Sequence, residues 1–250
     1  MNHIDIIGID CSTNQRKLGL AKGIFFDGKL KVAEVADKKS NHIQTITSWL
    51  SDSPRALIAL DAPLGWPQAM GTNLNDHCAG EVIDVDSNTM FRRHTDCFVK
   101  RVLNKQPLDV GANLIARTAL FALQLVESLR KVTGKPVPMA WSPNFPSTYA
   151  VIEVYPAATL ESRGINSSGY KKTEQLERRK EILNLLKGEL QLECEEDKVV
   201  ANDDNLDAVL CLLAAADFLG DKAYEPSPDM MSTVEKESWI WVKTTDPKCF

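Results

Sequence analysis

Acidic residues occupy unusual positions in this sequence, at the ends of apolar runs or inside them. Asp10 and Asp61 each close an apolar run of strand length, and Glu153 lies within a third such run. A buried carboxylate costs free energy unless it is paired or binds a metal ion. Each acid also has a structural interpretation, since the two aspartates suit turns and Glu153 suits an ion pair with an arginine. If the strands bring them together, they predict a cation site.

Further acids begin a late apolar helix, predicted at 206–219. Asp204 and Asp207 are three positions apart, so they would lie on one side of that helix. Acids in a first turn stabilise a helix through its macrodipole, and Asp203 and Asp204 are natural caps. Asp207 lies beyond the capping position in an otherwise apolar stretch, which favours a functional role for it.

The hydrophobic patterns predict an α/β fold. Three strands come first, the second and third joined at the hairpin signal Asp27-Gly28, and strands alternate with helices after them. We expect a mixed sheet covered by helices, in one domain that spans residues 1–250. Strands are predicted at 4–11, 18–26, 29–36, 56–61, 149–154 and 238–242, and helices at 41–50, 111–132, 171–186 and 206–219.

Residues 63–110 differ from the segments on either side. They show no clear periodicity and contain many polar, charged and glycine residues. We expect a large inserted loop or irregular cap after the fourth strand. Long irregular segments in compact domains usually carry function or move.

Composition excludes several classes of protein. The chain of 250 residues is 44% hydrophobic and 25% charged, which is typical of a soluble globular protein and not of a disordered or fibrous one. No apolar run approaches the ~18 residues of a membrane span, and no signal-peptide pattern is present. Six cysteines occur without a CxxC pair. We therefore expect a cytoplasmic protein with reduced thiols.

Two basic segments lie within a chain whose net charge is −5. One contains Arg92, Arg93 and His94, and the other, at 171–180, contains Lys172. Arginine can hold phosphate through two hydrogen bonds, so these segments are candidates for contact with a nucleic acid backbone. A solvated loop and the exposed face of a helix are equally open interpretations.

The clustered acids suit one kind of catalysis better than others. No glycine-rich dinucleotide-binding or phosphate-binding loop occurs, and the four histidines have no metal-binding spacing. Magnesium and manganese prefer carboxylate oxygen. Two such ions about 3.5–4 Å apart can activate water and stabilise the leaving oxygen of a phosphodiester. That chemistry requires three or four carboxylates from separate elements.

Six segments, in this order, match the pattern of one known family. They are GIDCST (8–13), ALDAPLGWP (59–67), FRRHTD (91–96), VIEVYPAATL (151–160), DDNLDAVLCLLAA (203–215) and SWIWV (238–242). The chain thereby resembles domain of unknown function 429, a family described as predicted nucleases of the ribonuclease H-like fold. Its acidic helix is also similar to the last helix of RuvC-type resolvases. The resemblance implies that Asp10, Asp61 and the Asp204/Asp207 helix bind metal, with Glu153 beside them.

Our leading hypothesis is a nuclease that depends on magnesium or manganese and uses a two-metal carboxylate mechanism on DNA or RNA. Asp10, Asp61 and Asp207 would hold the metals, and Asp204 or Glu153 would complete the shell. The predicted catalytic set comprises Asp10, Asp61, Glu153, Asp204 and Asp207, all metal ligands except Glu153. The predicted substrate-binding set comprises Arg92, Arg93, His94 and Lys172.

Two other functions remain open. Sugar and acetate kinases share this core, so a nucleotide-dependent phosphotransferase is the first alternative, although a second glycine-rich loop is missing. A non-catalytic nucleic-acid or protein binding module that retains the fold is the second, since acids can persist for structural reasons. Stabilisation by ATP and magnesium would favour the first. Binding that survives loss of the acids would favour the second.

Overall fold

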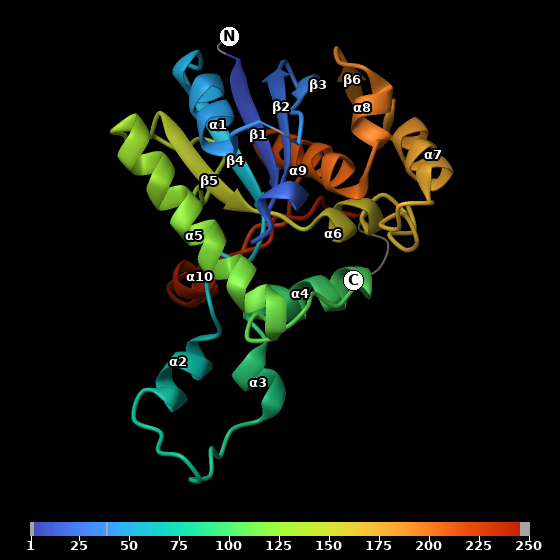
Figure 1. Ribbon diagram of the computed structural model, residues 1–250. Coiled ribbons are helices and arrows are strands. Elements are labelled where there is room, and N and C mark those ends of the chain that lie inside the picture. The colour runs from blue at the N-terminus through green and yellow to red at the C-terminus, as the bar shows by residue number, and fades with distance from the viewer. Residues whose placement is uncertain (1–2, 39, 246–250) are drawn as a thin grey trace.

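A mixed sheet of six strands forms the centre of the molecule (Figure 1). The computed structural model describes residues 3–38 and 40–245. The strand order is β5-β4-β1-β2-β3-β6: β1, β2 and β3 are antiparallel neighbours, β4 and β5 run parallel to β1, and β6 runs parallel to β3. The predicted mixed α/β sheet covered by helices is confirmed. The strands are β1 (Ile4–Asp10), β2 (Gly19–Phe26), β3 (Lys29–Val35), β4 (Ala56–Asp61), β5 (Tyr149–Glu153) and β6 (Leu190–Leu192).

The predicted hairpin joins β2 to β3. Asp27 and Gly28 have φ angles of 51° and 71°, and Phe26 pairs with Lys29 across the turn. Two-residue turns with positive φ at both positions match the twist of the flanking strands, and Asp-Gly suits them because glycine has no Cβ. The turn residues therefore set the pairing of these two strands locally.

Helices cover both faces of the sheet (Figure 1). One face, which includes Ile6, packs against α9 (Asp203–Leu219). The other face, which includes Ile7, packs against α1 (His42–Ser51) and α5 (Asn113–Thr133). Alternate residues of a strand thus face opposite layers, and covered strands are apolar along nearly their whole length.

Two glycines allow α9 to lie directly on the sheet. A Cβ atom at Gly8 would be 2.1 Å from the carbonyl oxygen of Ala208, and one at Gly19 would be 2.0 Å from that of Asp204. Any other residue would push the helix away from the strands. The close approach brings the first turns of α9 to the carboxyl end of β1.

The segment after β4 contains helices that the sequence analysis missed. The short helices α2 (Gln68–Leu74) and α3 (Ser87–Phe91) project away from the sheet at the bottom of Figure 1. The longer helix α4 (His94–Leu103) begins after Arg93, whose backbone N–H donates to Asp96 Oδ2 at 2.9 Å. The expectation of an irregular segment is wrong for α4. Its buried positions include a threonine and Asp96, which hides the apolar pattern of the helix.

The helix predicted at 171–186 is shorter than expected. It begins at Leu176 and is labelled α7 (Leu176–Leu186). Arg179 donates to the carbonyl oxygens of Tyr170 and Lys172 at 2.9 Å each, and these bonds hold the preceding segment as a loop. The remaining helices of the described chain are α6 (Pro156–Glu161), α8 (Glu196–Val200) and α10 (Met231–Glu237), with the 3₁₀ turns η1 (Gln15–Lys17) and η2 (Pro228–Met230).

Residues 238–242 do not form the predicted regular strand. Ile240 alone makes a β-bridge, to Glu153. The N–H of Ile240 donates to the hydroxyl of Thr95 at 2.7 Å, and the bridge to β5 is made by the N–H of Trp241, which donates to the carbonyl oxygen of Glu153 at 3.1 Å. Ser238, with a φ of 71°, redirects the chain directly after α10.

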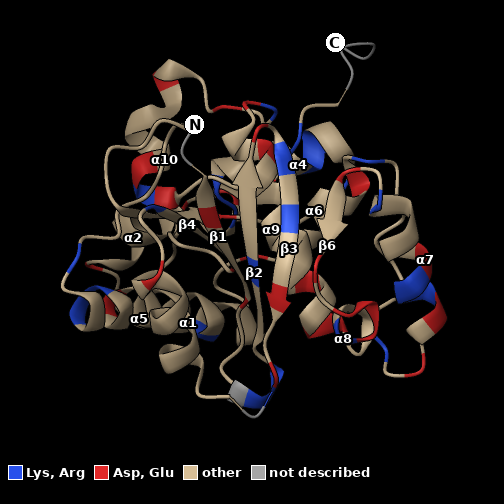
Figure 2. Ribbon diagram, turned by 90° about the horizontal axis from the view of Figure 1, so that it is seen from above, with Lys and Arg blue, Asp and Glu red and all other residues tan. Residues whose placement is uncertain are grey.

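Charges of both signs are spread over the outer elements (Figure 2). On α7, Arg178 pairs with Glu181 and Lys180 pairs with Glu177. These basic residues have acidic partners one turn away on the same helix, which agrees with the interpretation of a solvated helix face.

The described residues contain neither a membrane-spanning helix nor a disulfide bond. Within them, no helix is long and apolar enough to span a bilayer. Free thiols occur at Cys11, Cys78, Cys97, Cys194 and Cys211, and Cys249 lies outside the described residues.

Candidate metal centre

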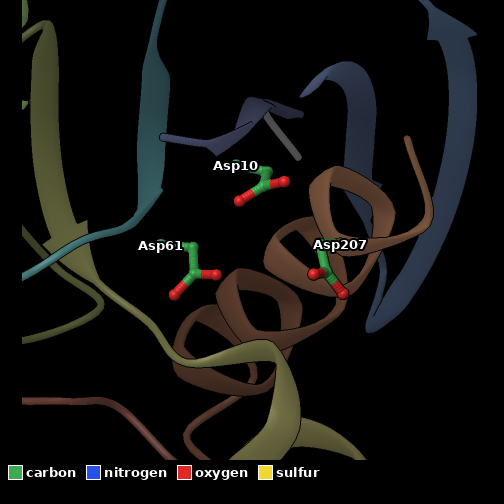
Figure 3. A group of neighbouring side chains, drawn as sticks. All are labelled: Asp10, Asp61 and Asp207. Atoms are coloured by element: carbon green, nitrogen blue, oxygen red, sulfur yellow. The ribbon is translucent and has the colours of Figure 1, made fainter. Parts of the chain in front are cut away.

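Three aspartates from three elements meet at the carboxyl end of the central strands (Figure 3). Asp10 ends β1, Asp61 ends the neighbouring parallel strand β4, and the two are partners in the register of the sheet. Asp207 comes from α9, beyond its first turn. One carboxylate oxygen from each residue lies within 4.8 Å of the other two. The structure thus brings together three of the four acids that were predicted to bind metal, all except Asp204.

Strand alternation explains why these side chains share one side of the sheet. Ile6 and Gly8 face α9, so Asp10, which continues the same alternation, faces it too. In β4, Leu57 packs in the layer of α9, and Asp61 lies four positions later on the same face. Asp207 then needs only the close contact of α9 with the sheet to reach both.

Asp207 is 1% exposed, and both of its oxygens have partners. The Tyr170 hydroxyl donates to Oδ1 at 2.6 Å, and the Lys171 ammonium lies 2.8 Å from Oδ2. Both partners come from the loop before α7. They orient the carboxylate while leaving each oxygen a second lone pair for a metal ion.

Asp10 and Asp61 lack such partners. Within the described residues, no side-chain donor or cation lies at hydrogen-bond or ion-pair distance from either carboxylate; the Lys171 ammonium pairs with Asp207. Burial raises the pKa of Asp10 well above its usual value, and the charges of Asp207 and Asp61 raise it further. Burial also raises the pKa of Asp61 to about 7, an effect that Lys171 opposes and Asp207 increases. A single ammonium leaves the three carboxylates with excess negative charge.

The donor set fits a hard divalent cation. Oxygen ligands from several carboxylates suit Mg²⁺ and Mn²⁺, whereas zinc prefers histidine and cysteine. Two thiols, Cys11 and Cys211, are buried close by, but burial raises their pKa values well above the usual value and keeps them protonated. A bound cation would offset the repulsion among the aspartates.

Glu153 is not a member of this group. It is 2% exposed, and its two oxygens accept hydrogen bonds from Nη1 and Nη2 of Arg93 at 2.8 Å each. The N–H of Leu64 also donates to it, at 2.9 Å. In the sheet Glu153 pairs with Leu60, which packs in the layer of α1 and α5, so its side chain faces away from α9. Glu153 has the structural role of a buried ion pair.

Asp204 also lies outside the group, although it is on the same helix as Asp207. Its carboxylate pairs with the ammonium of Lys38. The charge of Asp204 still raises the pKa of Asp10 slightly, after the larger effects of burial and the other two aspartates. Asp204 is therefore a neighbour of the site with a partner of its own.

Arg93 needs correction as a substrate-binding residue. Its side chain is 1% exposed and is bound on both sides, by Glu153 and by Asp96 at 2.9 Å. It also donates to the carbonyl oxygen of Glu237 at 3.1 Å. With its donors used inside the protein, Arg93 connects β5, α4 and α10 and cannot reach a phosphate.

The other predicted substrate-binding residues are accessible. Arg92 is partly exposed and pairs with Asp109 at 3.3 Å. The side chain of His94 is 55% exposed, with Nδ1 2.9 Å from Glu237. Lys172 is exposed, next to the loop residue that binds Asp207.

The sequence analysis missed Tyr170 and Lys171 as part of the site. Both contact Asp207, which is 37 residues from Tyr170 in the sequence. Lys171 belongs to the basic segment at 171–180. A loop residue that returns to a strand end, however, has no periodic pattern that would distinguish it from its neighbours. Only the position of the loop in the fold identifies these two residues.

Comparison with known proteins adds a family. RuvC of T. thermophilus, solved in complex with a Holliday junction substrate, is similar with a TM-score of 0.35 and 11% sequence identity, over 86% of this chain and 94% of the RuvC chain. No curated protein matches the chain. The model of the family described as "Protein of unknown function (DUF429)" matches residues 8–231, and the chain therefore belongs to the DUF429 family.

Proposed function

We propose that this protein is a nuclease that hydrolyses phosphodiester bonds in nucleic acid with the help of bound Mg²⁺ or Mn²⁺. The observation that carries the proposal is the convergence of Asp10, Asp61 and Asp207, whose carboxylate oxygens lie within 4.8 Å of one another. Carboxylates from separate elements at one strand edge are the donor set that such catalysis requires. No other group in the described residues combines three metal-ligating side chains in this way.

The three aspartates would hold the metal, which when bound activates water and stabilises the leaving oxygen of a phosphodiester. Tyr170 and Lys171 hold Asp207 in one orientation, through contacts of 2.6 Å and 2.8 Å. The ammonium of Lys171 also places a positive charge beside the site, where it can attract a substrate phosphate. The protein thus contributes ligands, their orientation and a local cation.

Contacts with the substrate backbone are proposed for the accessible basic residues. Arg92, His94 and Lys172 are exposed or partly exposed; the first two belong to the inserted segment, and Lys172 belongs to the loop before α7. Arginine and lysine bind phosphate without reading sequence, so these contacts would position nucleic acid rather than select it.

Cleavage assays with labelled DNA and RNA test the proposal. We expect cleavage with Mg²⁺ or Mn²⁺ and none with EDTA. Asp10→Asn and Asp61→Asn should each reduce the rate by more than about 100-fold, because each removes a charged metal ligand. Asp52→Asn, at an exposed aspartate at the end of α1, is the matched control and should retain the rate. Cleavage that persists in EDTA or in both site variants would refute the mechanism.

A further inference from the structure

A cavity of about 550 Å³ adjoins Asp61 at the candidate metal centre. Its walls come from the loops after β4 and β5, from residues 167–171 and from the segment that joins α4 to α5. In Figure 1, α4 and the start of α5 lie below the carboxyl ends of the strands, and Lys105, Pro107 and Leu108 from the segment between these two helices line the cavity. Pockets of roughly 300–1,000 Å³ typically hold one small molecule.

One wall of the cavity is apolar. It contains Pro107, Leu108 and Ile115, from the segment before α5 and its first turn. Leu108 is 67% exposed, so it contributes little to the packing of the core. A large apolar side chain at the mouth of a polar site is suited to contact a flat, apolar face of a ligand.

The same cavity has an unpaired cation. Lys105 is partly buried in its wall, and no carboxylate among the described residues lies within ion-pair distance of it. Elsewhere in the lining, Glu153 is neutralised by Arg93, while Asp61 and Lys171 belong to the metal centre. A partly desolvated lysine without an acidic partner favours an anionic ligand.

We infer that this cavity holds one unpaired nucleotide of the substrate, with its base against the apolar wall and a phosphate near Lys105 and the metal centre. The inference rests on the proposed nuclease function and names its substrate class: nucleic acid that is single-stranded, or unpaired, next to the cleaved bond. A paired base inside a duplex cannot enter a pocket of this size unless it leaves the stack. Stacking on apolar side chains is tolerant of sequence, so little base preference is expected.

Binding measurements test the inference, with Ca²⁺ present in place of Mg²⁺ to prevent cleavage. The probes are a fluorescein-labelled 12-nucleotide DNA strand, the same strand in a duplex, and adenosine monophosphate. Single-stranded DNA should bind at least ~10-fold more tightly than the duplex. Leu108→Ser and Lys105→Gln should each weaken binding of the strand and of the mononucleotide by roughly 5- to 100-fold.

Matched controls exist for both variants. Leu114 is 62% exposed and does not line the cavity, so Leu114→Ser controls for Leu108→Ser. Lys100 is an exposed lysine bonded to Asn104, so Lys100→Gln controls for Lys105→Gln. Both controls should bind like the unmodified protein.

The outcomes separate this inference from the proposed function. Equal or tighter binding of the duplex, or equal binding by the cavity variants and their controls, would overturn the cavity assignment even if metal-dependent cleavage is found. Mononucleotide binding that depends on Leu108 and Lys105 in a protein without any cleavage activity would support the cavity and refute the nuclease function.

Discussion

Two groups of buried acids lie at the same end of the sheet, and they differ in charge balance. Glu153 and Asp96 share the guanidinium of Arg93, with N–O distances of 2.8 Å and 2.9 Å. The three aspartates of the candidate metal centre share one ammonium, that of Lys171, which pairs with Asp207. The Arg93 guanidinium gives these two carboxylates four of its five N–H donors, whereas one ammonium does not satisfy three carboxylates.

This difference separates Glu153 from the acids that we propose to bind metal. Glu153 has its partners within the fold, so nothing outside the protein is needed to stabilise it. Asp10 and Asp61 have raised pKa values because burial is not compensated by partners. Asp10 and Asp61 are less deeply buried than Glu153 and Asp96, so the supply of donors, and not the depth of burial, distinguishes the two groups.

The largest effect on stability is expected from Arg93→Met, which would leave Glu153 and Asp96 buried without a partner. Removing one member of a buried ion pair typically costs about 3–5 kcal/mol. For a chain of this length the melting temperature should fall by on the order of 10 °C in thermal unfolding. Arg92→Met is the matched control, since Arg92 is partly exposed, and it should cost at most ~1 kcal/mol. Equal shifts for the two variants would mean that the Arg93 group is not a structural centre.

Metal binding should stabilise the protein through Asp10, Asp61 and Asp207, and not through the acids that pair with Arg93. Magnesium at 100 times its dissociation constant would add about 2.7 kcal/mol to the free energy of unfolding. Asp207→Asn should abolish the increase in melting temperature caused by Mg²⁺. Glu153→Gln should lower the melting temperature but keep the magnesium-dependent increase, because Glu153 binds Arg93 rather than the site. Loss of the increase in Glu153→Gln would instead place Glu153 among the ligands.

A smaller effect is expected from pH in metal-free protein. The pKa of Asp61 is raised to about 7 in the folded state, so the folded protein holds a proton that the unfolded chain releases near pH 4. Stability in EDTA should therefore decrease as pH rises from about 4 to about 7, by roughly 1–3 kcal/mol. Asp61→Asn should flatten this dependence and raise the melting temperature at pH 8. If Asp61→Asn left the dependence of stability on pH unchanged, the Asp61 carboxyl group would not be the cause of that dependence.

The positions of β1 to β5 and the three converging aspartates could be predicted because both depend on local patterns, whereas β6, with three residues, is too short to show such a pattern. Apolar runs located β1 and β4, and Asp10 and Asp61 close them. Glu153 was predicted to lie beside the aspartates, but residues along a strand alternate between the two faces of the sheet. Glu153 pairs with Leu60 and so faces the other side of the sheet from Asp61. Register between distant strands is set by tertiary packing, which one strand's pattern does not contain.

Loop and capping residues could not be predicted from the hydrophobic periodicity of the sequence. Tyr170 and Lys171 contact Asp207 from a loop that is fixed by hydrogen bonds from Arg179, and no local sequence pattern predicts that contact. The helix α4 buries Asp96 beside Arg93, so its charged sequence resembles a surface loop. In both cases a long-range polar contact replaces the apolar pattern that sequence analysis relies on.

The smallest effect is expected at Asp204, and it decides the composition of the metal shell. Asp204 pairs with Lys38, so Asp204→Asn should weaken Mg²⁺ binding, measured by isothermal titration calorimetry, by less than ~5-fold. Asp207→Asn should weaken it by more than about 100-fold. Lys38→Met sharpens the comparison because it releases the Asp204 carboxylate: tighter Mg²⁺ binding in that variant would show that Asp204 is able to turn toward the site. If Asp204→Asn weakened Mg²⁺ binding as much as Asp207→Asn does, Asp204 would have to leave Lys38 when metal binds. The candidate metal centre would then contain four acids rather than three.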